Sequence, residues 1–201
     1  RMHIRRLLSV VILLGACPLL FAQKAPASPA EKAAAQPPDA ATLKKIVHDQ
    51  FGAGYKILPE YAPLVADFDG DGVEDLAIAA KALNPLLNAV EYNYKVIDPY
   101  HSFFGYGNPK VMMQFGADDP RQQGHVVLIV HGAVEGGWQA AQPKAKFVVV
   151  NLPYTRLSLS HVLLHKKPVG AVAAEEPDRV SSVVYWDGKK YKYEPMGADA
   201  D

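Results

Sequence analysis

The chain has 201 residues, in which 21 lysine and arginine side chains are balanced by 21 aspartate and glutamate side chains. This balance gives no electrostatic basis for binding nucleic acid or an anionic surface. The only cysteine is Cys17, so the folded domain can form no internal disulfide and must rely on its hydrophobic core and any bound metal. No stretch after residue 22 is long and apolar enough to cross a membrane, so we expect no transmembrane segment in the mature chain.

The N-terminus, residues 1–22, has the pattern of a secretory signal peptide. Basic residues precede a short apolar run at residues 7–14, and small residues follow it. We expect cleavage after Ala22, which would make the protein secreted or periplasmic. The four residues that end at Cys17 also fit a bacterial lipobox, so a lipid anchor at this cysteine is the alternative.

Residues 23–40 are rich in alanine and proline and contain no large apolar side chain, which predicts a flexible linker. A single globular domain should follow over residues 41–196, with residues 197–201 as a frayed tail. The domain should begin with a helix capped by Asp39 or Thr42, because apolar residues recur there at helical spacing. These apolar residues are Leu43, Ile46, Val47 and Phe51.

The strongest chemical signal is the acidic run at residues 67–75, Asp-Phe-Asp-Gly-Asp-Gly-Val-Glu-Asp. Four carboxylates this close repel one another unless a cation lies among them. Alternating oxygen donors on a coiled loop suit Ca²⁺, and the two glycines allow the tight turns that such a loop needs. Short apolar runs on both sides favour a strand–calcium loop–strand unit. The predicted ligands are the side chains of Asp67, Asp69, Asp71 and Asp75 and the main-chain carbonyl of Val73.

Residues 67–78 read Asp-x-Asp-Gly-Asp-Gly-x-x-Asp followed by Leu-Ala-Ile, which resembles the calcium loop of FG-GAP and VCBS-type repeats. Such repeats are found in integrin-like propellers and in many exported bacterial proteins. The resemblance covers residues 62–80 and implies Ca²⁺ as the cofactor. It also implies a single diverged copy of the unit, because four or more four-stranded blades do not fit in a chain of this length.

Residues 81–121 form an irregular insertion, interrupted by prolines and crowded with aromatic side chains. We expect a helical turn near residues 83–90 and a short strand at residues 110–115. The rings either fill a secondary core or form an exposed platform for a carbohydrate or a partner protein. Substituting Tyr100 and Phe104 would separate these two roles.

Four later strands are better defined. Residues 126–130 and 146–150 are continuously apolar, which is typical of strands buried on both faces. The Asp-Gly pair at residues 187–188 predicts a tight hairpin between the strands that flank it, residues 180–186 and 189–193.

Residues 157–165 fit either a strand or a helix. Together, the elements predict an α+β or mainly β fold. In it, one N-terminal helix packs on an antiparallel or mixed sheet of about five to seven strands.

The leading functional hypothesis is an exported, non-enzymatic calcium-binding domain, in which the ion orders a loop between two strands for adhesion or ligand binding. Two other readings of the acidic run are a solvated turn and a phosphatase-type loop with Asp67 as nucleophile and Asp69 as acid. The competing class is an extracytoplasmic hydrolase with its site near residues 81–121. A deep pocket holding Asp69 beside His101 or His131 would favour that class, although the sequence offers no nucleophile–base pair.

Overall fold

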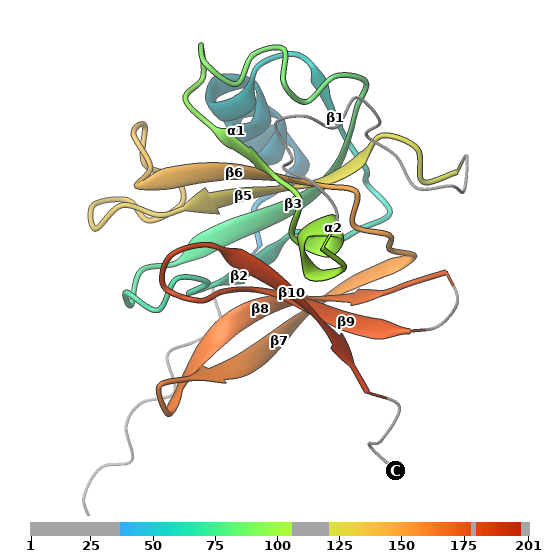
Figure 1. The fold of residues 1–201 in the computed structure, drawn as a ribbon. Coiled ribbons are helices and arrows are strands. Elements are labelled where there is room, and N and C mark those ends of the chain that lie inside the picture. Colours follow the sequence, from blue (N-terminus) through green and yellow to red (C-terminus); the bar gives the residue numbers. More distant parts are fainter. Residues whose placement is uncertain (1–36, 106–120, 178–179, 198–201) are drawn as a thin grey trace, which may run out of the picture. The chain divides into compact units, whose positions relative to one another are not determined.

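The fold is mainly β. The computed structural model describes residues 37–105, 121–177 and 180–197, all of which belong to one unit of the chain, residues 34–201 (Figure 1). Within these ranges, no helix is long and apolar enough to span a bilayer. The elements are α1 (Ala40–Phe51), β1 (Tyr55–Ile57), β2 (Leu64–Ala66), β3 (Asp75–Ala82), β4 (Lys95–Ile97), α2 (Pro99–Phe103), β5 (His125–His131), β6 (Ala145–Val150), β7 (Arg156–Leu164), β8 (Lys167–Glu175), β9 (Ser181–Trp186) and β10 (Tyr191–Met196).

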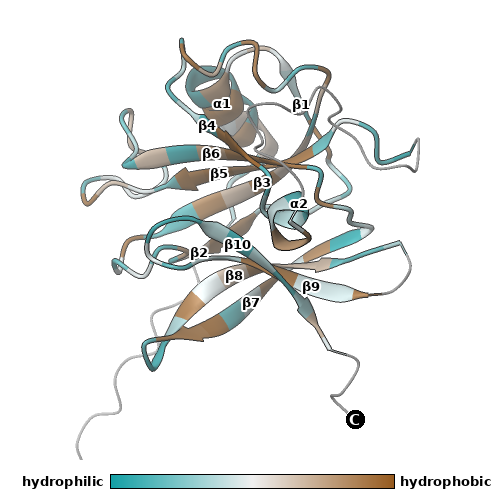
Figure 2. Ribbon diagram, viewed as in Figure 1, coloured by the Kyte–Doolittle hydropathy of each residue, from teal (hydrophilic) through white to brown (hydrophobic). Residues whose placement is uncertain are grey.

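The larger sheet is mixed and has six described strands, in the order β1-β3-β5-β6-β4, with β2 also pairing with β3. All pairs of neighbouring strands in this sheet are antiparallel except β4 and β6, which run parallel to each other. The apolar runs that predicted buried strands lie in β5 and β6, and both strands are buried over most of their length. In Figure 2 these two strands carry much of the apolar colour of the sheet.

The second sheet has four described strands in the order β10-β9-β8-β7, and all its neighbours are antiparallel. The sequence had predicted only one sheet. The hairpin at residues 187–188 joins β9 to β10, and the ambiguous residues 157–165 fall almost entirely in the strand β7. A strand is favoured there because β7 pairs along its whole length with β8, a stretch whose pattern had predicted no element.

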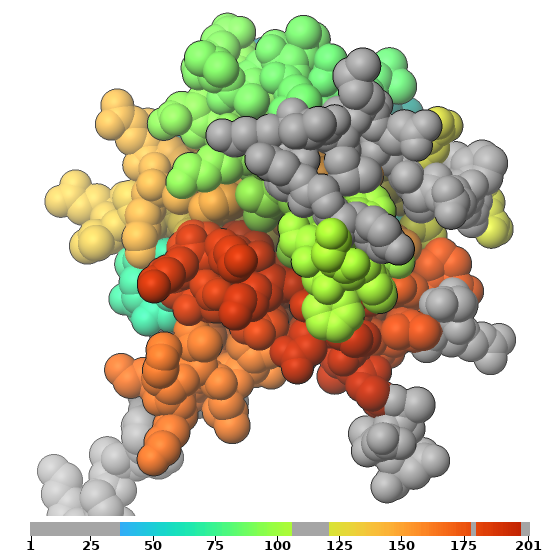
Figure 3. Space-filling view, viewed as in Figure 1, coloured from blue at the N-terminus to red at the C-terminus, as the bar shows by residue number. Residues whose placement is uncertain are grey.

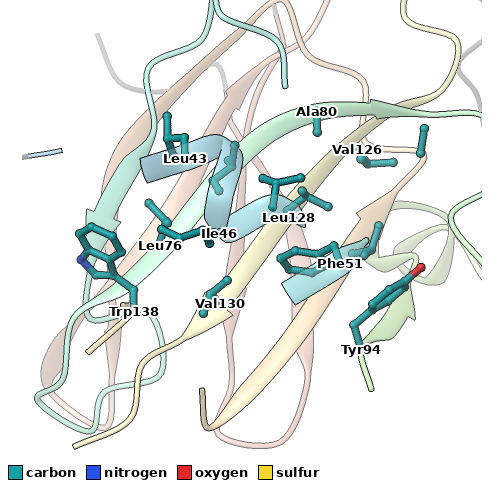
Figure 4. Close-up of a cluster of buried hydrophobic side chains, with 14 of the residues drawn as sticks. Leu43, Ile46, Phe51, Leu76, Ala80, Tyr94, Val126, Leu128, Val130 and Trp138 are labelled. Atoms are coloured by element: carbon teal, nitrogen blue, oxygen red, sulfur yellow. The ribbon is translucent and has the colours of Figure 1, made fainter. Parts of the chain in front are cut away.

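The helix α1 covers one face of the larger sheet. Its N-terminal cap is Asp39, whose side chain accepts a hydrogen bond from the N–H of Thr42 at 2.8 Å. The apolar side of α1 packs on alternate residues of the central strands, and Trp138 and Tyr94 lie in the same cluster (Figure 4). The labelled members of this cluster are Leu43, Ile46, Phe51, Leu76, Ala80, Tyr94, Val126, Leu128, Val130 and Trp138.

The other face of the larger sheet packs against the smaller sheet, so the elements form three layers: helix, sheet and sheet. Residues of β3, β5 and β6 that alternate with the first cluster form this second core with residues of β8, β9 and β10. Its buried members include Ala77, Ala79, Val127, Ile129, Phe147, Val149, Val172, Ala174, Val184, Tyr191 and Tyr193.

The described part of the irregular insertion ends at residue 105. Residues 85–93 form consecutive turns, β4 joins the edge of the larger sheet, and α2 packs on β10. The rings differ in exposure, because Tyr94 is buried while Phe103 and Phe104 are half exposed. A binding role for the exposed rings remains a prediction. The expected strand at residues 110–115 lies outside the described residues.

Candidate metal site

The acidic run connects β2 to β3 and is closed by the pairing of Ala66 with Asp75. Gly70 and Gly72 have φ values of 78° and 87°, the left-handed region that glycine adopts without strain. The ring of Phe68 is 1 % exposed and packs in the core between the sheets. The loop is therefore anchored by an apolar side chain, while the side chain of Asp71 stays 29 % exposed.

Asp67 organises the main chain of the loop. Its Oδ1 atom accepts hydrogen bonds from the N–H groups of Gly70 and Asp71, at 2.7 and 3.1 Å. Its Oδ2 atom accepts a hydrogen bond from the N–H of Gly72 at 2.7 Å. Three N–H groups of the loop thus point towards one carboxylate, which holds the backbone in a coil around it.

Asp69 and Asp71 share a lysine. The Nζ atom of Lys144 lies 2.6 Å from Oδ2 of Asp69 and 2.6 Å from Oδ2 of Asp71. Partial burial lowers the pKa of Lys144, but its hydrogen bonds to the two carboxylates outweigh this and raise the pKa above its ordinary value. The Lys144 side chain is 49 % exposed, so its ammonium group can leave the carboxylates for solvent.

Asp69 also contacts a buried histidine. Its Oδ2 atom lies 3.2 Å from Nδ1 of His131, and Nε2 of His131 lies 2.6 Å from the hydroxyl oxygen of Tyr191. Burial raises the pKa of Asp69, but the hydrogen bonds from His131 and Lys144 lower it by more. The pKa of Asp69 is therefore well below its usual range. The imidazole therefore connects the acidic loop to β10.

Asp75 is fully buried and both its oxygens have main-chain partners. Oδ2 accepts the N–H of Phe68 and Oδ1 accepts the N–H of Gly132, each at 2.7 Å. Burial raises the pKa of Asp75 to about 7, against these two hydrogen bonds, which lower it. A Cβ atom on Gly132 would lie 2.3 Å from the carbonyl oxygen of Glu74, so glycine is needed where the end of β5 passes the loop. Asp75 thus clamps the loop to the end of β5.

The structure brings three of the four predicted carboxylates into one group. Oxygen atoms of Asp67, Asp69 and Asp71 lie within 4.8 Å of one another. Oxygens bound to one Ca²⁺ at about 2.3–2.6 Å can be at most about 5.2 Å apart, so this group fits the ion. Asp75 belongs to a second group, with Asp69 and His131. Val73 donates its N–H to Oδ1 of Asp71 at 2.8 Å, and its carbonyl as a ligand remains a prediction.

Sequence reasoning missed Lys144, and it considered His131 beside Asp69 only as part of a hydrolase pocket. Both residues are far from the loop in sequence and reach it through the sheet. His131 pairs with Ala145 across β5 and β6, and Lys144 donates its N–H to the carbonyl of His131 at 3.0 Å. A pairing register between distant strands leaves no local signal in the sequence.

The hydrolase hypothesis required a deep pocket that holds Asp69 beside His101 or His131, and only the contact with His131 is found. Asp69 lies beside His131, but His131 is 2 % exposed and its second ring nitrogen is held by Tyr191. A cavity along α1 and a cavity beside β10 are lined by described residues, and neither of them is lined by Asp69 or His131. His101 lies elsewhere, with its Nδ1 atom 2.8 Å from Oδ2 of Asp98.

Comparisons of the chain with models of known protein families, with curated proteins and with solved structures found no significant match.

Proposed function

We propose that this protein is an exported calcium-binding domain, in which Ca²⁺ bound by Asp67, Asp69 and Asp71 orders the loop between β2 and β3. The observation that supports this most directly is the convergence of these carboxylates within 4.8 Å, on a loop already coiled around Asp67. The likeness of residues 67–78 to FG-GAP and VCBS-type calcium loops supports the same ion. A structural task follows, in which the ion fixes the loop and the strands that leave it.

The proposal gives each neighbouring group a role. The carbonyl of Val73 and water complete the coordination shell, as oxygen donors suited to Ca²⁺. Each oxygen of Asp75 accepts one main-chain N–H, so Asp75 would become the fourth carboxylate ligand through a remaining lone pair. The ammonium of Lys144 contacts the oxygens that the ion would bind, so lysine and calcium compete for Asp69 and Asp71.

The contact between Asp69 and His131 favours the hydrolase as second candidate, because a carboxylate–histidine pair is a common catalytic unit. A general base must reach the proton that it removes. His131 is almost fully buried and both its nitrogens have partners, so we rank this activity below calcium binding.

Calcium titration by isothermal calorimetry, with melting curves, tests the proposal on the wild-type protein and on Asp71→Ala. Asp71 is the choice because its side chain is 29 % exposed, so its loss disturbs packing little. A site with a dissociation constant of about 10⁻⁴ M would add about 1.4 kcal/mol in about 1 mM calcium. This corresponds to a rise of about 3–6 °C in melting temperature.

The matched control is Asp49→Ala, which removes an exposed carboxylate that pairs with Lys45 on α1. We expect Asp49→Ala to bind calcium like the wild type and Asp71→Ala to lose most of the binding heat and the thermal shift. A wild-type protein that shows neither heat nor a thermal shift in calcium would overturn the proposal.

A further inference from the structure

A second feature, separate from the acidic loop, is a cavity of about 380 Å³ between β4, α2 and the β9–β10 hairpin. Its size falls within the range of small-molecule sites in proteins. Figure 3 shows the hairpin, in red, and α2, in yellow-green, side by side on the surface. The hairpin carries hydrophilic colour in Figure 2, so a polar edge borders the cavity.

The cavity has an excess of positive charge. Four lysines line it against one carboxylate, Asp98. Asp98 is 2 % exposed and already accepts hydrogen bonds from His101 and Asn151, so it offers little to a ligand. The four lysines are Lys95, Lys189, Lys190 and Lys192.

Three of these lysines form no ion pair with an acidic side chain of the described residues. Lys192 pairs with Asp187, with Nζ and Oδ2 3.0 Å apart. Among the described residues, no carboxylate forms an ion pair with Lys95, Lys189 or Lys190. The Nζ atom of Lys95 lies over the face of Phe147, 5.9 Å from the centroid of the ring. An anion in the cavity would therefore meet ammonium groups that are not neutralised by the protein.

The walls of the cavity are aromatic and held in place by one another. The ring of Trp186 lies 5.4 Å from Phe147 and 5.2 Å from Tyr191, measured between centroids. Phe103 of α2 is 49 % exposed and lies 5.3 Å from Tyr193. Rings fixed by packing offer a ligand flat apolar surfaces at low entropic cost.

We propose that this cavity binds an acidic saccharide, through lysine contacts to its carboxylates and stacking of its sugar rings on Trp186 and Phe103. The C–H groups on one face of a sugar ring pack well on an aromatic ring, and an acidic peptide lacks such faces. Among the described residues, the cationic side chains that line the cavity are all lysines, which meet an anion as separate point charges. Carboxylates spaced along a chain of sugars can each meet a different lysine.

The test uses tetragalacturonic acid and its full methyl ester as probes, by isothermal calorimetry in EGTA. The chelator keeps calcium from both the acidic loop and the saccharide, so the outcome does not depend on the proposed calcium site. We expect the acid to bind at least about tenfold more tightly than the uncharged ester. Added salt should weaken the binding of the acid. Equal affinity for acid and ester would overturn the proposal.

Variants locate the site. The double variant Lys189→Met, Lys190→Met should lose at least about tenfold in affinity for the acid. The matched control is Lys166→Met, Lys167→Met, which removes two adjacent exposed lysines from the β7–β8 turn of the same sheet. If both double variants bind equally, the cavity is not the site.

Stacking is tested separately with Trp186→Ala, which should weaken the binding of the acid and of the ester by the same factor. Poly-glutamate serves as a second probe. If it binds the wild-type protein as tightly as the sugar acid does, charge alone is recognised and the partner is an acidic peptide, which would overturn the saccharide assignment.

Discussion

Replacing Lys144 with methionine should make the protein bind calcium more tightly. The Lys144 ammonium contacts Asp69 and Asp71 at 2.6 Å each, and these are two of the three proposed ligands. An incoming ion must displace the ammonium before it can use these oxygens. Methionine keeps much of the length of the side chain but carries no charge, so the displacement cost disappears.

The size of the gain follows from the exposure of the lysine. Because the Lys144 side chain is 49 % exposed, each of its ion pairs contributes about 0.2–1 kcal/mol, the range of surface pairs. Two such pairs give about 0.4–2 kcal/mol, which corresponds to about 2- to 30-fold in the dissociation constant for calcium. Without calcium, the same variant should be less stable than the wild type by a similar amount.

Calcium titration by calorimetry and urea denaturation in EGTA measure the two effects. The matched control is Lys44→Met, which removes one positive charge from an exposed position on α1. It separates competition at the site from a general change in net charge. Unchanged or weaker calcium binding by Lys144→Met, relative to Lys44→Met, would refute the view that the ammonium and the ion compete.

Three further outcomes are expected. The pKa of Asp69 is lowered in the folded state, so its contribution to stability is present above about pH 4 and is lost as the pH falls further. In urea denaturation in EGTA, the free energy of unfolding of Asp69→Asn should therefore fall less below about pH 4 than that of the wild type. Gly170→Ala should lower the melting temperature by about 2–10 °C, because the new Cβ would lie 2.8 Å from the carbonyl oxygen of Asp67; an unchanged melting curve would contradict this. Tyr191→Phe should cost about 1–3 kcal/mol in chemical denaturation, because it leaves a buried nitrogen of His131 without a partner; a cost near zero would show that this hydrogen bond has no net value.

The candidate site was predictable where its geometry is local. Alternating aspartates separated by glycines bring Asp67, Asp69 and Asp71 together within a few residues of chain. The environment of Asp75 was not predictable in this way, because one of its partners is Gly132 at the end of a distant strand. The contact of Lys144 likewise depends on the register of β5 and β6.

The fold shows the same division. The apolar runs of β5 and β6 and the Asp-Gly turn of the last hairpin are local signals, and each marks its strands in the structure. The smaller sheet was missed because β8 gave no such signal. It contains Pro168, Gly170 and several alanines, which have low strand propensity. Its conformation is set by pairing with β7 and β9.

Gly170 has a further role, because it lets β8 approach the acidic loop closely enough to donate its N–H to the carbonyl of Asp67 at 2.8 Å. The smaller sheet is therefore attached to the loop at two places, here and through the hydrogen bond between His131 and Tyr191. Tyr191 also lines the cavity beside β10, so one imidazole joins the proposed calcium loop to the proposed saccharide cavity. Thermodynamic reciprocity then sets a rule for the molecule: by whatever factor calcium changes saccharide affinity, the saccharide must change calcium affinity equally.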